Sequence, residues 1–274
     1  PADTGMVDLK KDLEEYPVEQ SFTHQVDKKA IPTCPILGVN IAAIDMPWLL
    51  AFTEKHLGAL SGDYICVSNV HTTVTAWKDE AYRAVQNGGI LAIPDGGPLS
   101  STGRKRGYES MRRVTGPDYM LKAIELGLSK GWRHYFYGST PETLEKMEKT
   151  LRERYPDIQI AGTYSPPFRA LSPEEDGEIV EKINRTAPDF VWVGLGAPKQ
   201  EIWMGAHQGK LHGLMVGVGA AFDYTAGNIS RAPQWMQKHN LEWLYRLMQD
   251  PKRLFKRYFV TNTTYIIQAD LRGK

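Results

Sequence analysis

Phe190-Val-Trp-Val-Gly-Leu-Gly-Ala-Pro-Lys-Gln-Glu201 joins a short apolar run to a glycine-rich turn and the polar start of a helical pattern. A second apolar run ends in a similar way, at Gly217-Val-Gly-Ala-Ala-Phe-Asp223. In α/β proteins, strand ends of this composition lie at the crevice that binds anionic ligands. The two stretches therefore predict an α/β fold whose functional site lies at the carboxyl ends of its strands.

On both sides of these stretches, short apolar runs alternate with helical patterns. The apolar runs lie at residues 36–41, 64–68, 90–93, 134–137, 158–161, 190–193 and 214–218. The helical patterns lie at residues 46–59, 72–87, 117–130, 141–154, 173–186 and 199–208. Near-continuous apolar strands separated by helices are typical of a parallel sheet covered on both faces. We therefore predict Rossmann-like parallel sheets covered by helices, in two adjoining halves that meet near residue 110.

The chain divides into three expected segments. Residues 1–34 are polar, mixed in charge and without clear periodicity, so we predict an extension outside the core. Residues 35–240 are the expected α/β catalytic core, and residues 241–274 the expected appendage. Within the core, Ser139-Thr-Pro-Glu142 and Ser172-Pro-Glu-Glu175 each place a Glu three residues after a Ser. This spacing, with Pro in the first turn, predicts helices capped by the two serines.

Composition limits the function to local sites. The 274 residues are 42% hydrophobic and 24% charged, which is typical of a globular protein. The net charge is +1, so no overall field attracts nucleic acid. Cys34 and Cys66 are too few for a disulfide framework, which fits a reducing compartment, and we expect Cys66 to be a buried thiol. No apolar stretch approaches the roughly 20 residues of a spanning helix.

The C-terminal segment mixes basic and apolar residues. Residues 241–274 carry seven basic residues against three acidic ones, interleaved with aromatic and aliphatic residues and interrupted at Pro251. Basic amphipathic helices of this kind bind anionic bilayers, and each basic residue contributes about 1 kcal/mol near the surface. Two closing helices with solvated Lys and Arg side chains give the same pattern equally well.

Asp95 is the candidate catalytic residue. It follows the predicted strand at residues 90–93, within Pro94-Asp-Gly-Gly-Pro98. A carboxylate at the carboxyl end of a parallel strand faces the ligand crevice, where it can take a proton from an attacking hydroxyl group. Without other motifs, a simple Asp-Gly turn is the more common explanation.

Polar residues also follow the strand at residues 64–68, in the sequence Val67-Ser-Asn-Val-His-Thr-Thr73. Four side chains there are candidates for binding sugar hydroxyl groups beside Asp95, namely Asn69, His71, Thr72 and Thr73. Asn and Thr are also common N-cap residues, and capping by one of them does not exclude ligand contacts by the others.

Two further strand ends are candidates for the diphosphate of a nucleotide. Gly138 and Ser139 open a strand-to-helix turn, where the helix dipole favours an anion. Between Gly194 and Glu201, glycines permit close approach of the backbone, and Lys199 lies in a first helical turn, where an anion would relieve its conflict with the dipole. A tight turn with an exposed Lys is the alternative. The candidate residues for binding an anionic ligand are Gly138, Ser139, Gly194, Gly196, Lys199, Gln200, Glu201, Asp223 and Arg231.

Dinucleotide and metal sites have little support. Gly217, Gly219 and Phe222 approximate a dinucleotide-binding fingerprint, but its third glycine is absent. Arg231 and Asp223 either bound the ligand site or form a structural ion pair. The seven His residues are scattered and show no spacing typical of metal ligands.

Taken together and in order, these motifs resemble the WecG/TagA/CpsF family of bacterial glycosyltransferases (glycosyltransferase family 26). The resemblance covers residues 36–258. The residues that carry it are Asn69, Thr72, Asp95, Gly96, Gly116, Gly138, Tyr155, Pro156, Gly162, Gly194 to Glu201, Gly219, Phe222, Asp223, Gly227, Arg231 to Pro233, Glu242, Trp243, Arg246, Arg257 and Tyr258. His71, Tyr119 and the long N-terminal extension depart from what the family leads us to expect.

The resemblance implies a reaction and roles for particular residues. Such enzymes transfer a sugar from a UDP-sugar to a polyprenyl-diphosphate-linked sugar, with inversion at the anomeric carbon. The resemblance implies that Asp95 is the base and that Gln200 binds the nucleotide, with Asn69 and Thr72 in the polar pocket. It also implies that the anionic ligand of the nine candidate residues between Gly138 and Arg231 is UDP. It also implies a membrane-docking appendage whose arginines help to hold the diphosphate. The candidates are Arg246, Arg253 and Arg257.

We therefore predict an inverting glycosyltransferase that moves a hexose or an N-acetylhexosamine-type sugar without a metal or other cofactor. Its predicted partners are a UDP-sugar, a polyprenyl-diphosphate-linked acceptor and the cytoplasmic face of the cell membrane, with a homo-oligomer also compatible and no nucleic acid. Two other interpretations stay open, namely a non-catalytic nucleotide-sugar or lipid-binding module and, with less support, an NAD-dependent oxidoreductase. N-Acetylmannosamine, its uronic acid, glucose and galactose fit the sequence equally as the transferred sugar.

Overall fold

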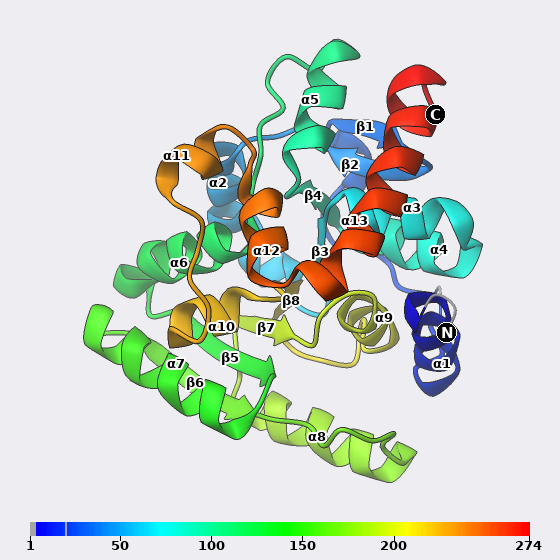
Figure 1. The fold of residues 1–274 in the computed structure, drawn as a ribbon. Coiled ribbons are helices and arrows are strands. Elements are labelled where there is room, and N and C mark those ends of the chain that lie inside the picture. Colours follow the sequence, from blue (N-terminus) through cyan, green and yellow to red (C-terminus); the bar gives the residue numbers. More distant parts are fainter. Residues whose placement is uncertain (1–3, 20) are drawn as a thin grey trace.

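A six-stranded parallel sheet forms the centre of the computed structural model, which describes residues 4–19 and 21–274, and their side chains except those of residues 4–8 and Arg253 (Figure 1). The strands are β3 (Tyr64–Ser68), β4 (Leu91–Pro94), β5 (Arg133–Gly138), β6 (Gln159–Tyr164), β7 (Phe190–Gly194) and β8 (Leu214–Gly217). Their order is β4-β3-β8-β7-β5-β6, and all neighbours are parallel. The predicted α/β fold is confirmed.

Successive side chains along the strands enter two separate hydrophobic clusters. In β7, Val191 and Val193 belong to one cluster, whereas Phe190 and Trp192 belong to the other. Because side chains of a strand point alternately to its two faces, each cluster is the core on one face of the sheet. Burial on both faces explains why these strands are almost continuously apolar.

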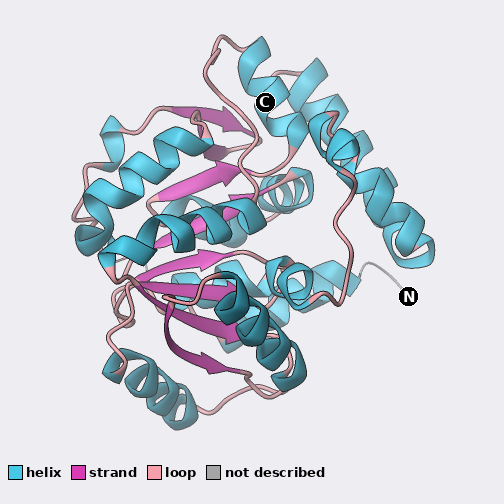
Figure 2. Ribbon diagram, turned by 90° about the vertical axis from the view of Figure 1, so that its left-hand side faces the viewer, coloured by secondary structure: helices cyan, strands magenta, loops and turns pink. Residues whose placement is uncertain are grey.

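Helices cover both faces of the sheet (Figure 2). The helices that contribute to the cluster of Phe190 are α2 (Met46–His56), α6 (Gly116–Gly127), α7 (Pro141–Arg154) and α10 (Ala221–Ala226). The helices that contribute to the cluster of Val191 include α3 (Val70–Lys78), α4 (Glu80–Gly88), α8 (Pro173–Arg185) and α9 (Lys199–Ala206). Short helical turns are η1 (Lys28–Ala30), η2 (Leu57–Leu60) and η3 (Leu128–Lys130).

Strand β8 connects the parts of the chain before and after residue 110. Tyr64 of β3 pairs with Met215 of β8, and on the other side Phe190 of β7 pairs with Leu214. The two expected halves therefore contribute to one continuous sheet.

The single strand predicted at residues 36–41 is wrong, because this segment is a hairpin. Strand β1 (Thr33–Ile36) pairs antiparallel with β2 (Val39–Ala42). Leu37 and Gly38 form the turn, with φ of 52° and 82°. Two-residue hairpin turns with positive φ at both residues are common, but Leu rarely adopts this conformation, so the turn was not recognised.

Two helix predictions also need correction. The single helix expected at residues 72–87 is two helices, because the chain turns at Asp79, whose side chain accepts a hydrogen bond from the Tyr82 N–H and caps α4. Helix α5 (Gly97–Lys105) was not predicted, because its Gly and Ser content is typical of a loop.

The two predicted N-caps have different outcomes. Thr140, and not Ser139, caps α7 by accepting a hydrogen bond from the Thr143 N–H, and Ser139 instead has a φ of 61°. Ser172 caps α8 in a capping box with Glu175, as predicted.

Part of the N-terminal segment packs on the core, although we expected residues 1–34 to form an extension outside it. Helix α1 (Thr4–Glu15) lies against α9, and both Leu9 and Tyr16 are buried in the core cluster of Val191. Leu9, Leu13 and Tyr16 recur at the spacing of one helical face, which the surrounding charged residues conceal.

The C-terminal segment is helical and breaks at Pro251, as predicted. Its helices are α11 (Gln234–Lys238), α12 (Glu242–Gln249), α13 (Pro251–Tyr265) and the π-helical turn η4 (Ile266–Leu271). Helix α13 lies against α3 and buries Leu254 and Tyr265, whereas Phe255 and Phe259 are 63% and 65% exposed. Among the described residues, no helix combines the length and the hydropathy that a bilayer span requires.

Candidate active site

All six parallel strands end at one edge of the sheet, which we call the carboxyl edge. Asp95 follows β4 and Asn69 follows β3. Gly138 is the last residue of β5, and Gly196 and Gly219 follow β7 and β8. The chain runs outward from β3 to β4 and, in the opposite direction, from β5 to β6, with β8 and β7 between. Open α/β sheets bind ligands at the carboxyl edge near such a reversal of direction. The predicted strand-end residues therefore share one edge.

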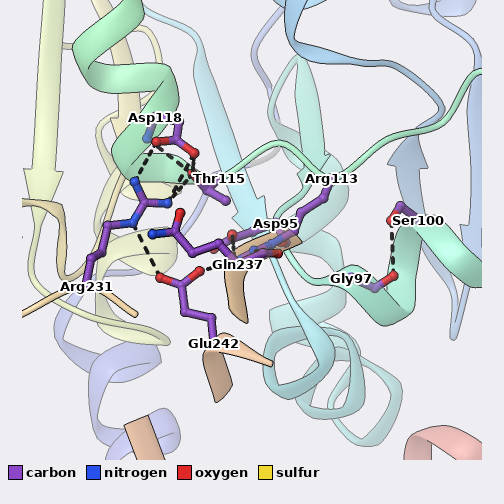
Figure 3. A network of polar contacts seen from close by, with 9 residues as sticks. All are labelled: Asp95, Gly97, Ser100, Arg113, Thr115, Asp118, Arg231, Gln237 and Glu242. Atoms are coloured by element: carbon purple, nitrogen blue, oxygen red, sulfur yellow. Dashed lines mark hydrogen bonds and ion pairs between the residues drawn. The ribbon is translucent and has the colours of Figure 1, made fainter. Parts of the chain in front are cut away.

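Asp95 lies next to a cluster of charged residues (Figure 3). Its backbone N–H donates to the Ser68 carbonyl at 2.8 Å, which ties the end of β4 to the end of β3. Arg113 donates from Nε to the Asp95 carbonyl at 2.7 Å, and its Nη2 lies 4.0 Å from the Asp95 carboxylate. Burial raises the pKa of Asp95 to about 6, opposed by Arg113 and reinforced by Glu242. About a quarter of the side chain, 26%, stays exposed, so a substrate can reach it.

Glu242 of α12 joins two arginines in this cluster. Its Oε2 accepts from Nη2 of Arg113 at 2.5 Å, and its Oε1 lies 3.4 Å from Nε of Arg231. Arg231 in turn donates to Asp118 of α6 at 2.6 Å and 3.1 Å (Figure 3). These contacts hold α12 and the segment before α11 against the carboxyl edge.

The polar residues after β3 mainly cap α3. Asn69 and Thr72 form a reciprocal capping box, and the Thr73 hydroxyl donates to the carbonyls of Asn69 and Val70. Thr72 and Thr73 were predicted to bind sugar, but both are buried and their hydroxyl groups make hydrogen bonds within the first turn of α3. Asn69 lies close to the Asp95 loop, because a Cβ on Gly96 would be 3.6 Å from the Asn69 Cα.

His71 has a different environment. Its Nδ1 atom is buried and has no hydrogen-bond partner among the described residues. Burial lowers the pKa of His71 to about 3, with further lowering by Arg257 and Lys78. His71 is therefore neutral near pH 7, so one of its ring nitrogens is an acceptor.

Gln200 and Glu201 belong to a buried hydrogen-bond network. Gln200 Oε1 accepts the backbone N–H groups of Gly196 and Gly219 at 3.2 Å and 3.1 Å, and its Nε2 donates to Glu201 at 2.9 Å. The hydroxyl group of Tyr82 donates to the other Glu201 oxygen at 3.1 Å. Burial raises the pKa of Glu201 to about 7.

The network extends to the strand beside Asp95. Gln86 donates from Nε2 to the Tyr82 hydroxyl at 3.0 Å and accepts from the Ser68 hydroxyl at 2.7 Å. The turns after β7 and β8 are therefore connected to β3 through buried polar groups. This explains why Gln200 and Glu201 are almost inaccessible, although both were predicted to bind UDP.

Three other predicted UDP-binding residues make protein contacts. Lys199 Nζ lies 3.9 Å from Glu15 of the N-terminal helix. Arg231 pairs with Asp118 and not with Asp223, which instead accepts from Asn228 at 3.0 Å. The predicted alternative of an Arg231–Asp223 pair is therefore wrong.

Gly138 brings two strand ends together. Its φ is 123°, and a Cβ there would lie 2.5 Å from the Gly194 carbonyl oxygen. Only glycine fits this approach, and Ser139 N donates to the same carbonyl at 3.1 Å. Helix α7 begins directly after this turn.

Two of the three predicted tail arginines lie near candidate site residues. Arg246 lies close enough to Asp95 to lower its pKa, and Arg257 does the same to His71. The side chain of Arg253 lies outside the described part of the chain. In that described part, no three His, Cys, Asp or Glu side chains gather into a metal-binding group.

Sequence reasoning missed Arg113, Asp118 and Tyr82. Arg113 follows Arg112 in a segment without periodicity, and its partner Glu242 is 129 residues away. Such long-range pairs leave no local pattern. Glu242 was noted among the family motifs but was not assigned a site role.

The fold and the site define an α/β enzyme that works at the carboxyl ends of parallel strands. A model of the Glycosyl transferase WecG/TagA/CpsF family matches residues 34–273, and the chain belongs to this family. It is therefore a glycosyltransferase, and neither an oxidoreductase nor a non-catalytic binding module.

Three curated relatives share the name N-acetylglucosaminyldiphosphoundecaprenol N-acetyl-beta-D-mannosaminyltransferase. The protein from Bacillus subtilis is 31% identical over 228 residues, which is 82% of this chain and 85% of the relative. The protein from Bacillus spizizenii is 29% identical over 223 residues, or 81% and 85% of the two chains. The protein from Staphylococcus aureus is 28% identical over 239 residues, or 86% and 89%.

Proposed function

We propose that this glycosyltransferase moves a hexose or an N-acetylhexosamine-type sugar from a UDP-sugar to a polyprenyl-diphosphate-linked saccharide, with inversion at the anomeric carbon. The relatives support this acceptor class, since their name specifies an N-acetylglucosaminyl group on diphosphoundecaprenol. The observation that carries the proposal is Asp95, a partly exposed carboxylate at the carboxyl edge with basic side chains around it.

Asp95 acts as the general base. Its carboxylate takes the proton from an acceptor hydroxyl group while that oxygen attacks the anomeric carbon of the donor. A new glycosidic C–O bond forms, the bond between the anomeric carbon and the diphosphate oxygen breaks, and UDP leaves with the bonding electron pair. A single displacement of this kind inverts the configuration and needs only one base. A pKa of about 6 leaves Asp95 ionised at neutral pH and more basic than an exposed aspartate.

Cations and backbone N–H groups would stabilise the departing diphosphate. Helix α7 begins at the carboxyl edge just after Gly138, and its dipole favours an anion there. Arg246 and Arg257 approach the site from the tail, close to Asp95 and His71 respectively. Lys199 would join them only after its contact with Glu15 is broken.

The tail would dock on the membrane that carries the acceptor. Phe255, Phe259 and Ile266 are exposed at helical spacing along one side of α13 and η4, with Lys252 and Lys256 nearby. Exposed apolar side chains flanked by lysines suit the interface of an anionic bilayer. This arrangement favours the membrane over the alternative of solvated closing helices, and it supports a place at the cytoplasmic face of the cell membrane.

A UDP-release assay tests the proposal, with a short-chain polyprenyl-diphosphate sugar as acceptor and a series of UDP-sugars as donors. Mass spectrometry of the lipid product identifies the transferred sugar. The Asp95→Asn variant should lose at least about 100-fold in turnover, because amide nitrogen and oxygen do not accept the proton. Near wild-type turnover in Asp95→Asn would remove Asp95 as the base, and the exposed Asp157→Asn variant provides the matched control.

A further inference from the structure

The guanidinium group of Arg113 lies between two carboxylates, those of Asp95 and Glu242 (Figure 3). Its Nη2 is 2.5 Å from Glu242 Oε2 and 4.0 Å from Asp95 Oδ1. The contact with Glu242 is a charge-assisted hydrogen bond, whereas the contact with Asp95 is a longer ion pair. Arg113 therefore favours the glutamate on α12 over the candidate base.

This arrangement is fixed from several sides. Arg113 Nε donates to the Asp95 carbonyl at 2.7 Å, which keeps the guanidinium beside the Asp95 side chain. Glu242 is 12% exposed and also lies 3.4 Å from Arg231, which Asp118 anchors at 2.6 Å. Because these contacts fix the Arg113 guanidinium and the Glu242 carboxylate, the docking of α12 decides how closely Arg113 approaches the Asp95 carboxylate.

We propose that Glu242 is a positioning residue for Asp95: by docking α12 on Arg113, it holds the guanidinium away from the Asp95 carboxylate and keeps that carboxylate basic. This inference rests on the proposed function, in which Asp95 is the base. It gives the C-terminal helices a second role besides docking, because the base is fully competent only when α12 is in place.

The other charged groups around Asp95 make this effect strong. Arg246 from α12 and Arg231 from the segment before α11 act on Asp95 as cations, in the same direction as Arg113. Tyr224 of α10 interacts with Asp95 as well. Glu242 is the one carboxylate among the groups that influence Asp95 most strongly. Without the negative charge of Glu242, the three arginines would stabilise the ionised form of Asp95 more strongly.

The test is the pH dependence of kcat/KM for the full-length enzyme with a UDP-sugar and the lipid-linked acceptor. In Glu242→Gln, Arg113 and the other arginines stabilise ionised Asp95, so the acidic limb of the profile should move to lower pH by about one unit. Turnover on the plateau should fall about threefold to tenfold, because a weaker base accepts the proton less readily. In Arg113→Gln, the acidic limb should move in the opposite direction, to higher pH.

Opposite shifts in these two variants would support the proposal, since a merely structural contact does not move the limb both ways. An acidic limb that stays in place in both variants would overturn it, whatever happens to the plateau. If Glu242→Gln does not fold, as judged by its thermal melting, Glu242→Asp takes its place: the shorter side chain draws away from Arg113, so its acidic limb should also move to lower pH, and a limb that stays in place would overturn the proposal. Asp95→Asn separates the two proposals: if it retains turnover, the proposed base fails, whereas loss of turnover with unshifted limbs removes only the role of Glu242.

Discussion

The side-chain oxygen of Gln200 accepts a hydrogen bond from the backbone N–H of Gly219 at 3.1 Å, across a separation of 19 residues. The same oxygen accepts the Gly196 N–H, so one amide holds the turns after β7 and β8 together. The buried Gln200 side chain thus fixes the positions of two turns at the carboxyl edge.

Gln200→Glu should destabilise the protein by about 2–4 kcal/mol at neutral pH, because it places a second carboxylate against buried Glu201. The loss of stability should be smaller at acidic pH, where a proton shared between the two carboxyl groups restores the hydrogen bond between residues 200 and 201. Urea unfolding at both pH values measures the effect. The exposed Gln159→Glu variant is the control, and equal stability of the two variants would contradict the structural role of Gln200.

Stability should also fall as pH rises through the titration of Glu201. Burial raises its pKa from 4.5 in the unfolded chain to about 7, so the folded state binds the proton more tightly. The stability that protonated Glu201 contributes is fully present below pH 4.5 and is lost as pH rises through about 7, with a size on the order of 3 kcal/mol. Unfolding free energies across this range should show the slope in the wild type and a smaller slope in Glu201→Gln, where the contribution of Asp95 remains. Exposed Glu153→Gln should retain the full slope.

The activity of the wild-type enzyme should fall at acidic pH with the protonation of Asp95. Because the base must be ionised, kcat/KM should drop about tenfold for each pH unit below the pKa of about 6. The profile of kcat/KM for the free enzyme reports this group. A limb near pH 4, as for an exposed carboxylate, would show that the surroundings of Asp95 do not raise its pKa in solution.

Removing the exposed phenylalanines of α13 should weaken membrane binding. Phe255→Ser with Phe259→Ser should lower the affinity for vesicles of anionic lipid at least about tenfold, since each ring contributes about 1.5–3 kcal/mol when buried. Co-sedimentation with vesicles measures this, and the melting temperature should change little. Phe168→Ser is the matched control, because that ring is 91% exposed but lies outside the tail. Equal losses in both proteins would point to general adhesion.

Most of the fold could be predicted because the parallel strands are buried on both faces. The apolar runs from Tyr64 to Val218 therefore stand out against the charged helices. The hairpin at Leu37 and helix α5 could not be predicted, since a Leu with positive φ and a Gly-rich helix contradict local preferences. In both cases the tertiary contacts override the preference of the residue.

The candidate site could be predicted only where its residues end strands. Asp95 and Asn69 follow strands, and the topology brings them together. Arg113 and Glu242 meet through packing of distant segments, which no spacing in the sequence reveals. The resemblance implies that Gln200 binds the nucleotide. The sequence places this polar residue in a first helical turn but does not show in which direction its side chain points.

The last strand to be made, β8, takes a place in the middle of the sheet, between β3 and β7. During synthesis on the ribosome, strands β3–β4 and β5–β7 therefore cannot join into one sheet until residues 214–217 emerge, and the edges of β3 and β7 stay unpaired. Unpaired edges of this kind invite aggregation, and late, non-local pairing is slow. Nascent chains that stall before Leu214 therefore leave the facing edges of β3 and β7 unpaired.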